Sequence, residues 1–134
     1  MSIASTIAVS GLNVASLRLQ VAASNIANSL SDGPLPGAPN ADNVPSAYAP
    51  LRVNQTDVVG GGTSASVSSI SPATVSTFDP TASFANADGF VTSPNVDLAN
   101  EMIQLLIART SYAANAQVIR ADAQMSAALL NITA

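Results

Sequence analysis

The sequence feature that most constrains the fold is a pair of long helical patterns, one at each end of the chain. No proline interrupts residues 2–30, and their apolar residues recur at the spacings of a helix surface. One row is Ile3, Ile7, Val14, Leu17 and Val21; a second row, repeating every seven residues, is Leu12, Leu19 and Ile26. A helix that is apolar on two sides needs two contact surfaces.

The closing segment has the same character. Pro94 is tolerated in a first helical turn, Asn95 or Asp97 can cap the helix, and Asp97 and Glu101 place negative charge near its amino end. One apolar face carries Leu98, Met102, Leu105, Tyr112 and Ile119, and another carries Ile103, Ile107, Val118, Met125, Leu129 and Ile132. The pattern predicts a helix from Pro94 to about Ile132.

The middle of the chain is rich in helix breakers. Residues 31–50 contain closely spaced Gly and Pro and are expected to be loop. Residues 48–59 and 63–70 have the alternation of two strands around a Gly60–Gly62 turn, which predicts a hairpin. Residues 71–93 are predicted to be extended chain with a turn at Asp88-Gly89. The expected fold is mainly α with a small β region, divided into residues 1–30, 31–93 and 94–134.

Composition excludes several classes of protein. The 134 residues suffice for one domain, but only 9% are charged, far below the roughly 25% that is usual. Much of the surface is therefore expected to meet something other than water. A net charge of −4 without a basic stripe argues against nucleic acid as a partner. The longest apolar run, residues 102–108, is too short to cross a bilayer.

The residue types also limit the chemistry. The chain has no His, Cys or Lys, so it cannot assemble a Ser-His or Cys-His nucleophile, a Walker loop or a Schiff base. Asp97 and Glu101 are one turn apart, but a helix amino terminus explains both carboxylates better than catalysis does. Residues 84–95 lack acidic residues at two positions of a calcium loop. No catalytic residue, cofactor or metal is expected.

Glu101 and Arg109 stand eight residues apart, too far for the i, i+4 pair that stabilises a helix surface. Two interpretations remain open. Both can be solvated surface charges, or each can set the register against a neighbouring helix, as isolated polar residues do in coiled coils.

Four short segments resemble a known family. Residues 23–28, ASNIAN, are similar to the amino-terminal signature of bacterial flagellar rod, hook and hook-associated axial proteins. Residues 87–91, ADGFV, with 94–102, PNVDLANEM, and 111–119, SYAANAQVI, resemble the shared carboxy-terminal signature of that family. Both signatures occur in the expected order at the two ends of the chain.

The resemblance implies terminal helices packed as a coiled-coil-like inner domain, with residues 31–93 as a short β-containing projection. It implies a structural subunit of the basal-body rod that assembles helically across the periplasm and transmits torque. The implied partners are copies of itself, other rod and hook proteins and the flagellar type III export apparatus, which would export the chain without a cleavable signal. The middle region is too short for the outer domains of a hook protein, so a proximal-rod subunit fits best.

The terminal helices supply the expected assembly residues. They are Ile3, Ile7, Val14, Leu17, Val21, Asn25, Asn28, Asn95, Asp97, Glu101, Met102, Leu105, Arg109, Tyr112, Asn115, Ile119, Met125, Leu129 and Ile132.

Three alternatives stay open. The chain can be a hook-like or other axial paralogue with a reduced middle. It can be a small helical export cargo or adaptor that forms a closed oligomer, in which case a discrete oligomer should exist in solution. The enzymatic alternative is a carboxylate-based periplasmic hydrolase, which would need a cleft holding two acidic residues.

Overall fold

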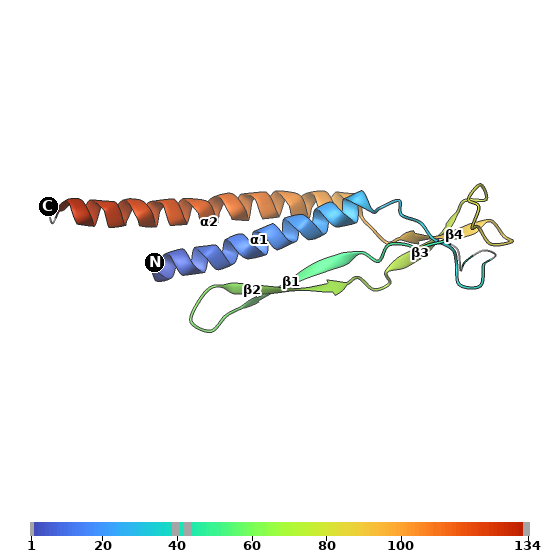
Figure 1. Ribbon diagram of the computed structural model, residues 1–134, viewed down its shortest axis with the longest axis horizontal. Helices are drawn as coiled ribbons and strands as arrows, with labels where there is room; N and C mark the ends of the chain where they lie inside the picture. Colours follow the sequence, from blue (N-terminus) through green and yellow to red (C-terminus); the bar gives the residue numbers. More distant parts are fainter. Residues whose placement is uncertain (1, 39–40, 42–43, 133–134) are drawn as a thin grey trace.

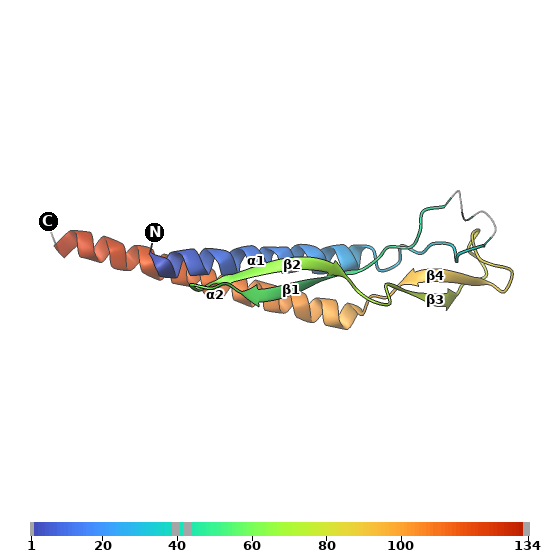
Figure 2. The same ribbon diagram turned by 90° about the horizontal axis from the view of Figure 1, so that it is seen from below.

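Two long antiparallel helices and two small hairpins make up an elongated molecule (Figures 1 and 2). The computed structural model describes residues 2–38, 41 and 44–132. The elements are α1 (Ile3–Ala27), β1 (Leu51–Asp57), β2 (Thr63–Ser69), β3 (Thr74–Phe78), β4 (Phe90–Pro94) and α2 (Leu98–Ile132). The prediction of a mainly helical fold with a small β region is confirmed. None of the helices in the described ranges combines the length and the apolar character that a membrane span requires.

Local hydrogen bonds fix the ends of both helices. The Ser2 hydroxyl accepts from the Ser5 amide at 3.1 Å at the start of α1, as an N-cap residue does. The Asp97 carboxylate accepts from the amides of Ala99 and Asn100 at 3.0 and 3.2 Å at the start of α2. The predicted helix start at Pro94 is wrong, because Pro94 is the last residue of β4 and pairs with Thr74.

Most of the buried residues of α1 and α2 have small side chains. The buried residues of α1 are Ser5, Ala8, Val14, Ala15, Ala22 and Asn25, and those of α2 are Glu101 and Ala108. At Gly11, even an added Cβ would lie 2.6 Å from the Asn115 side chain. The two backbones can approach closely because little side-chain volume separates them, and most large apolar residues are left facing outward.

The predicted hairpin forms from β1 and β2 and packs along α1 (Figure 2). Gly60, Gly61 and Gly62 have φ angles of 94°, 100° and 93°, which glycine adopts readily and other residues rarely do. The Thr63 amide donates to the Ser10 hydroxyl of α1 at 3.0 Å. The hairpin therefore covers one side of the helix pair.

A second hairpin lies beyond the ends of the helices (Figure 1). Residues 71–93 were expected to be extended with a turn, but Thr74–Phe78 and Phe90–Pro94 pair as antiparallel strands. The rings of Phe78 and Phe90 meet edge to face at 5.4 Å between centroids. Gly33 adds a two-bond bridge to Thr92, with both N···O distances at 2.9 Å. The expected turn at Asp88-Gly89 is present between these strands.

Candidate assembly interface

Asn25 is the most fully bonded side chain of the helix pair, and it is 1% exposed. Its Nδ2 donates to the Leu51 carbonyl and to Glu101 Oε1, both at 2.7 Å. Its Oδ1 accepts from the Leu51 amide and the Tyr48 hydroxyl, both at 3.0 Å. The Asn25 side-chain amide thus bonds to both the N–H and the carbonyl of Leu51, as the backbone of a neighbouring strand would. It joins α1, α2 and β1 at one point and uses its full bonding capacity.

Further polar contacts fix the register along the helix pair. The Arg18 guanidinium donates to Gln104 of α2 at 3.1 Å and to Gln55 of β1 at 2.9 Å. Near the amino end of α1, the Ser5 hydroxyl donates to Asp122 Oδ2 at 2.5 Å. Hydrogen bonds from the hydroxyls of Ser2 and Ser5 lower the pKa of Asp122 below its ordinary value of 3.8. Each of these hydrogen bonds joins a charged side chain to an uncharged one. They align α1 with α2 and β1 and leave the outer faces of the helices free of these contacts.

Glu101 and Arg109 have different surroundings. Glu101 is buried and has its hydrogen-bond partner, Asn25, within the same chain. Arg109 is exposed. The neighbouring helix that Glu101 faces is therefore α1 of its own chain, whereas Arg109 faces away from the chain interior.

The outer faces of the helices are unusually apolar. The described surface is 8574 Å², against about 6,500 Å² expected for a compact monomer of 13.4 kDa. Fully or largely exposed apolar side chains on the two helices include Ile3, Met102, Ile103, Leu106, Met125, Leu129, Leu130 and Ile132. Folding of one chain leaves a large apolar area uncovered.

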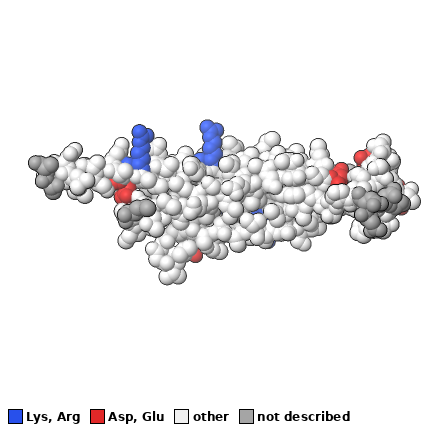
Figure 3. Space-filling model, in the orientation of Figure 1, with Lys and Arg blue, Asp and Glu red and all other residues white. Residues whose placement is uncertain are grey.

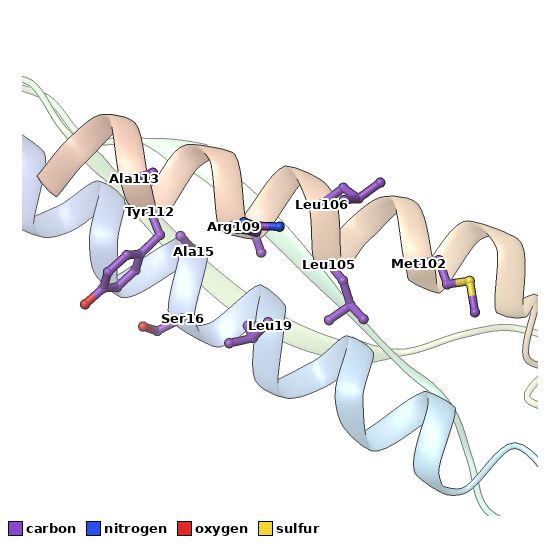
Figure 4. A pocket seen from close by; sticks show the side chains of 10 residues that line it. Ala15, Ser16, Leu19, Met102, Leu105, Leu106, Arg109, Tyr112 and Ala113 are labelled. Atoms are coloured by element: carbon purple, nitrogen blue, oxygen red, sulfur yellow. The ribbon is translucent and has the colours of Figure 1, made fainter. Parts of the chain in front are cut away.

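One part of this surface is hollowed into a groove between the two helices, of ≈ 750 Å³ (Figure 4). We call it the α1–α2 groove. Its lining residues are Ala15, Ser16, Leu19, Met102, Leu105, Leu106, Ala108, Arg109, Tyr112 and Ala113. The β1–β2 hairpin lies behind the helices in Figure 4 and contributes none of these residues. The groove therefore opens on the face of the helix pair that the hairpin leaves bare.

A second uncovered surface is the carboxyl end of α2. Residues 123–132 continue beyond the contact of Asp122 with Ser5 and are exposed throughout. This stretch, which we call the projecting segment, extends past the amino end of α1 in Figures 1 and 2. Its sequence, AQMSAALLNI, contains no charge.

The structure brings some of the expected assembly residues together and separates others. The groove gathers Met102, Leu105, Arg109 and Tyr112. The projecting segment carries Met125, Leu129 and Ile132, and Ile3 is exposed near it on α1. Ile119 and Val21 are half-buried.

Several other expected assembly residues serve the chain's own fold. Val14 and Asn25 are buried, and Asn28 and Asp97 lie at helix ends. Asn95 donates to the Pro72 carbonyl at 2.9 Å. Ile7, Leu17 and Asn115 line hollows between the helices and the hairpin. The sequence interpretation missed the small residues of the groove, Ala15, Ser16 and Ala108, although the spacing of Ala8, Ala15 and Ala22 by seven was visible.

Charge is confined to a few places on this surface (Figure 3). Basic side chains project outward over α2, and acidic side chains are visible toward the two ends of the molecule and at its lower edge. The described surface between them carries almost no charge in this view.

The molecule is an elongated helix pair with a small β region, and its polar network aligns its own helices. Its exposed apolar stripes are typical of a structural subunit of a larger assembly. The match to known proteins makes this specific. Residues 87–132 match the family described as flagellar basal body rod FlgEFG protein C-terminal. The chain is 34% identical over 135 residues to the flagellar basal-body rod protein FlgC of Agrobacterium fabrum, covering 98% of this chain and 94% of that protein. It is 36% identical over 118 residues to the protein of the same name from Salmonella typhimurium, covering 84% and 83% of the two chains.

The chain belongs to the FlgC family of flagellar basal-body rod proteins. Its function is that of a structural rod subunit of the bacterial flagellar basal body.

Proposed function

We propose that this subunit joins the rod through its terminal helices, in a helical assembly of copies of itself and other rod and hook proteins that transmits torque. The observation that carries the proposal is the uncovered apolar surface of both helices. Full burial of one large apolar side chain is worth about 1.5 to 3 kcal/mol. Neighbouring subunits that cover these side chains would supply that free energy.

The proposed location is the periplasmic part of the basal body, reached through the flagellar type III export apparatus without a cleavable signal. The support is the resemblance of both terminal signatures to axial proteins.

We propose no enzymatic activity for the chain. Both carboxylates that could have formed a catalytic pair have structural partners. Asp97 caps α2, and Glu101 accepts a hydrogen bond from buried Asn25. A hydrolase would need a cleft that presents two carboxylates to a substrate, and the α1–α2 groove has no acidic residue in its lining.

A truncation tests the assembly role of the terminal helices. In a strain that depends on this subunit, a chain lacking residues 125–134 should be exported but absent from purified basal bodies, and the cells should not swim. The matched control is the full chain with Ala127→Ser, because Ala127 lies on the opposite side of the helix from Met125 and Leu129. A normal rod built from the truncated chain would contradict the proposed role of the terminal helix.

A further inference from the structure

Each hairpin has one outer strand edge that the chain itself covers. Asn25 bonds to both the N–H and the carbonyl of Leu51 on the outer edge of β1. Gly33 bonds in the same way to Thr92 on the outer edge of β4, with both N···O distances at 2.9 Å. In the part of the chain that the structure describes, β3 and the stretch of β2 after Thr63 have no such cover on their outer edges. We call these the open edges.

The pairing within each hairpin shows which backbone groups lie on the open edges. In an antiparallel pair, alternate residues direct both the N–H and the carbonyl away from the partner strand. The Ile70 amide donates to the Pro50 carbonyl and the Asp79 amide to the Gly89 carbonyl, each at 2.9 Å, and these bonds set the alternation in the two hairpins. The outward-facing residues are Ala65, Val67 and Ser69 on β2 and Thr74, Ser76 and Phe78 on β3.

The helix α1 crosses the β1–β2 hairpin diagonally and leaves most of the β2 edge bare. It contacts the β2 edge at the Thr63 amide and the β1 edge at Leu51. These two points lie at opposite ends of the hairpin. Val67, midway along β2, is 40% exposed. The β2 edge is therefore accessible to another chain.

The sequences of β2 and β3 lack the features that keep an edge from pairing. Proteins protect exposed edges with charged residues, proline or a bulge. The strands β2 (TSASVSS) and β3 (TVSTF) contain neither charge nor proline, and their registers with β1 and β4 are continuous. An unprotected edge binds the backbone of another extended segment.

The two open edges cannot pair within one chain. The strands β2 and β3 run in the same direction and follow one another along the molecule (Figure 2), so a pair between them would be parallel. Only residues 70–73 link them, whereas parallel strands need a connection of about a dozen residues or more. We propose that the β2 edge of one copy of this chain pairs in parallel with the β3 edge of a second copy. The inference rests on the proposed helical assembly, in which copies of one orientation meet through different surfaces.

One register uses both edges fully. With Val67 of one copy opposite Val75 of the other, Val67 donates to the Thr74 carbonyl and accepts from the Ser76 amide, and the same alternation continues at Ser69. The side chains of Val67 and Val75, which are 40% and 44% exposed, then lie side by side and cover each other. This register displaces the copies by eight residues of extended chain, at most about 26 Å.

Disulfide formation tests the contact directly, because the chain contains no cysteine of its own. A chain with Val67→Cys and a second chain with Val75→Cys are expressed together in a strain that depends on this subunit. Opposite residues on neighbouring strands are about 4.8 Å apart, within the range of about 4.4 to 6.8 Å between Cα atoms that a disulfide bridges. Oxidised basal bodies should give a covalent dimer on a non-reducing gel, with a disulfide between positions 67 and 75.

The matched control replaces the second chain by one with Ser93→Cys, because Ser93 pairs with Val75 and lies one strand further from the contact. It should give monomer, since two strand spacings are about 10 Å and exceed the reach of a disulfide. Equal amounts of dimer in the two combinations, or monomer alone from the first, would overturn the proposal. A dimer from the Val67→Cys chain by itself would show a two-fold β2–β2 pair and would overturn it as well.

Proline substitution tests the contact without a cross-link. Val67→Pro removes an N–H from the open edge, and Val53→Pro removes one from the opposite edge at the same level, because the two valines are cross-strand partners. Neither change removes a hydrogen bond between β1 and β2. The two purified chains should have similar urea midpoints, but Val67→Pro should lower the amount of the chain in basal bodies about tenfold relative to Val53→Pro. Equal incorporation of the two variants would contradict the pairing.

These outcomes are separate from the test of the proposed function. Basal bodies that contain both cysteine chains without a cross-link overturn the β2–β3 contact and leave the proposed function standing. Absence of the unmodified chain from basal bodies contradicts the proposed function itself.

Discussion

At the scale of residues, one side chain holds three elements in register. Asn25 donates twice and accepts twice, and it is almost fully buried. A buried polar group is strongly destabilising when its partners are removed, since each unsatisfied group costs about 1–3 kcal/mol. Asn25, the first asparagine of the ASNIAN signature, therefore has a structural role inside the subunit.

Asn25→Asp should lower the free energy of unfolding by about 2–3 kcal/mol, because the carboxylate cannot donate to the Leu51 carbonyl or to Glu101. Urea unfolding followed by circular dichroism measures the loss. Adding Glu101→Gln should recover part of it, since the glutamine amide can donate to the new carboxylate. Asn13→Asp on the exposed side of α1 is the control and should change little. Equal effects at positions 13 and 25 would contradict the role of Asn25.

Asp122 should titrate below its ordinary pKa of 3.8 in the folded chain, because the hydroxyls of Ser2 and Ser5 stabilise its charged form. The folded pKa is the lower one, so this contact stabilises the fold above pH 3.8 and is lost as the pH falls through the folded value. The carboxyl-carbon chemical shift of Asp122 measures the titration, in samples concentrated enough for both chain ends to be ordered. Ser5→Ala should raise the pKa toward 3.8.

The matched control is Ser10→Ala, because the Ser10 hydroxyl bonds to the Ile7 carbonyl and the Thr63 amide instead. It should leave the titration of Asp122 unchanged. A native Asp122 that titrates at its ordinary pKa would rule out the hydrogen-bonded arrangement.

At the scale of elements, periodicity and turn residues predicted much of the fold. Both helices and the β1–β2 hairpin follow from the apolar spacing and from Gly60–Gly62. The β3–β4 hairpin did not follow, because its strands are only five residues long, and apolar periodicity does not reveal the Gly33–Thr92 bridge or the Phe78–Phe90 ring contact that accompany them. The groove was missed for a related reason. Apolar periodicity highlights large side chains, whereas Ala15, Ala22 and Ala108 are small residues that the structure buries.

Ala22→Leu should destabilise the helix pair by about 1–3 kcal/mol, because added side-chain volume in a close contact forces the backbones apart. The change in urea midpoint measures the effect. Ala23→Leu is the matched control, since Ala23 is the next residue of the same helix and is exposed. Similar midpoints for the two variants would show that alanine packing does not hold α1 against α2.

At the scale of the whole molecule, the subunit is incomplete on its own. Its described surface of 8574 Å² exceeds the area of a compact chain of this mass by about a third. The outer faces of α1 and α2 and the projecting segment contribute much of this excess. In most proteins, helical stability comes from the packing of an apolar face, and these faces lack a partner within the chain.

The purified chain at low concentration should therefore be less helical than α1 and α2 together, with both chain ends poorly ordered. Far-ultraviolet circular dichroism measures the helix content, and the same sample at high concentration is the reference because self-association should raise the signal. A dilute chain with full helix content and a sharp cooperative melt would contradict this view of the subunit.

The sparsely charged middle surface in Figure 3 also has a thermal consequence. Contacts between exposed charges weaken as salt shortens the screening length to about 10 Å at 0.1 M. Apolar contacts resist salt, but near 25 °C they are driven by entropy and weaken on cooling. In 0.5 M sodium chloride the screening length is on the order of 3 to 5 Å, and isolated rods held by this surface should keep their subunits. Near the freezing point of water, the same rods should release them. Electron microscopy of rods after each treatment would measure the loss of subunits. Cooling should remove more subunits than the salt does.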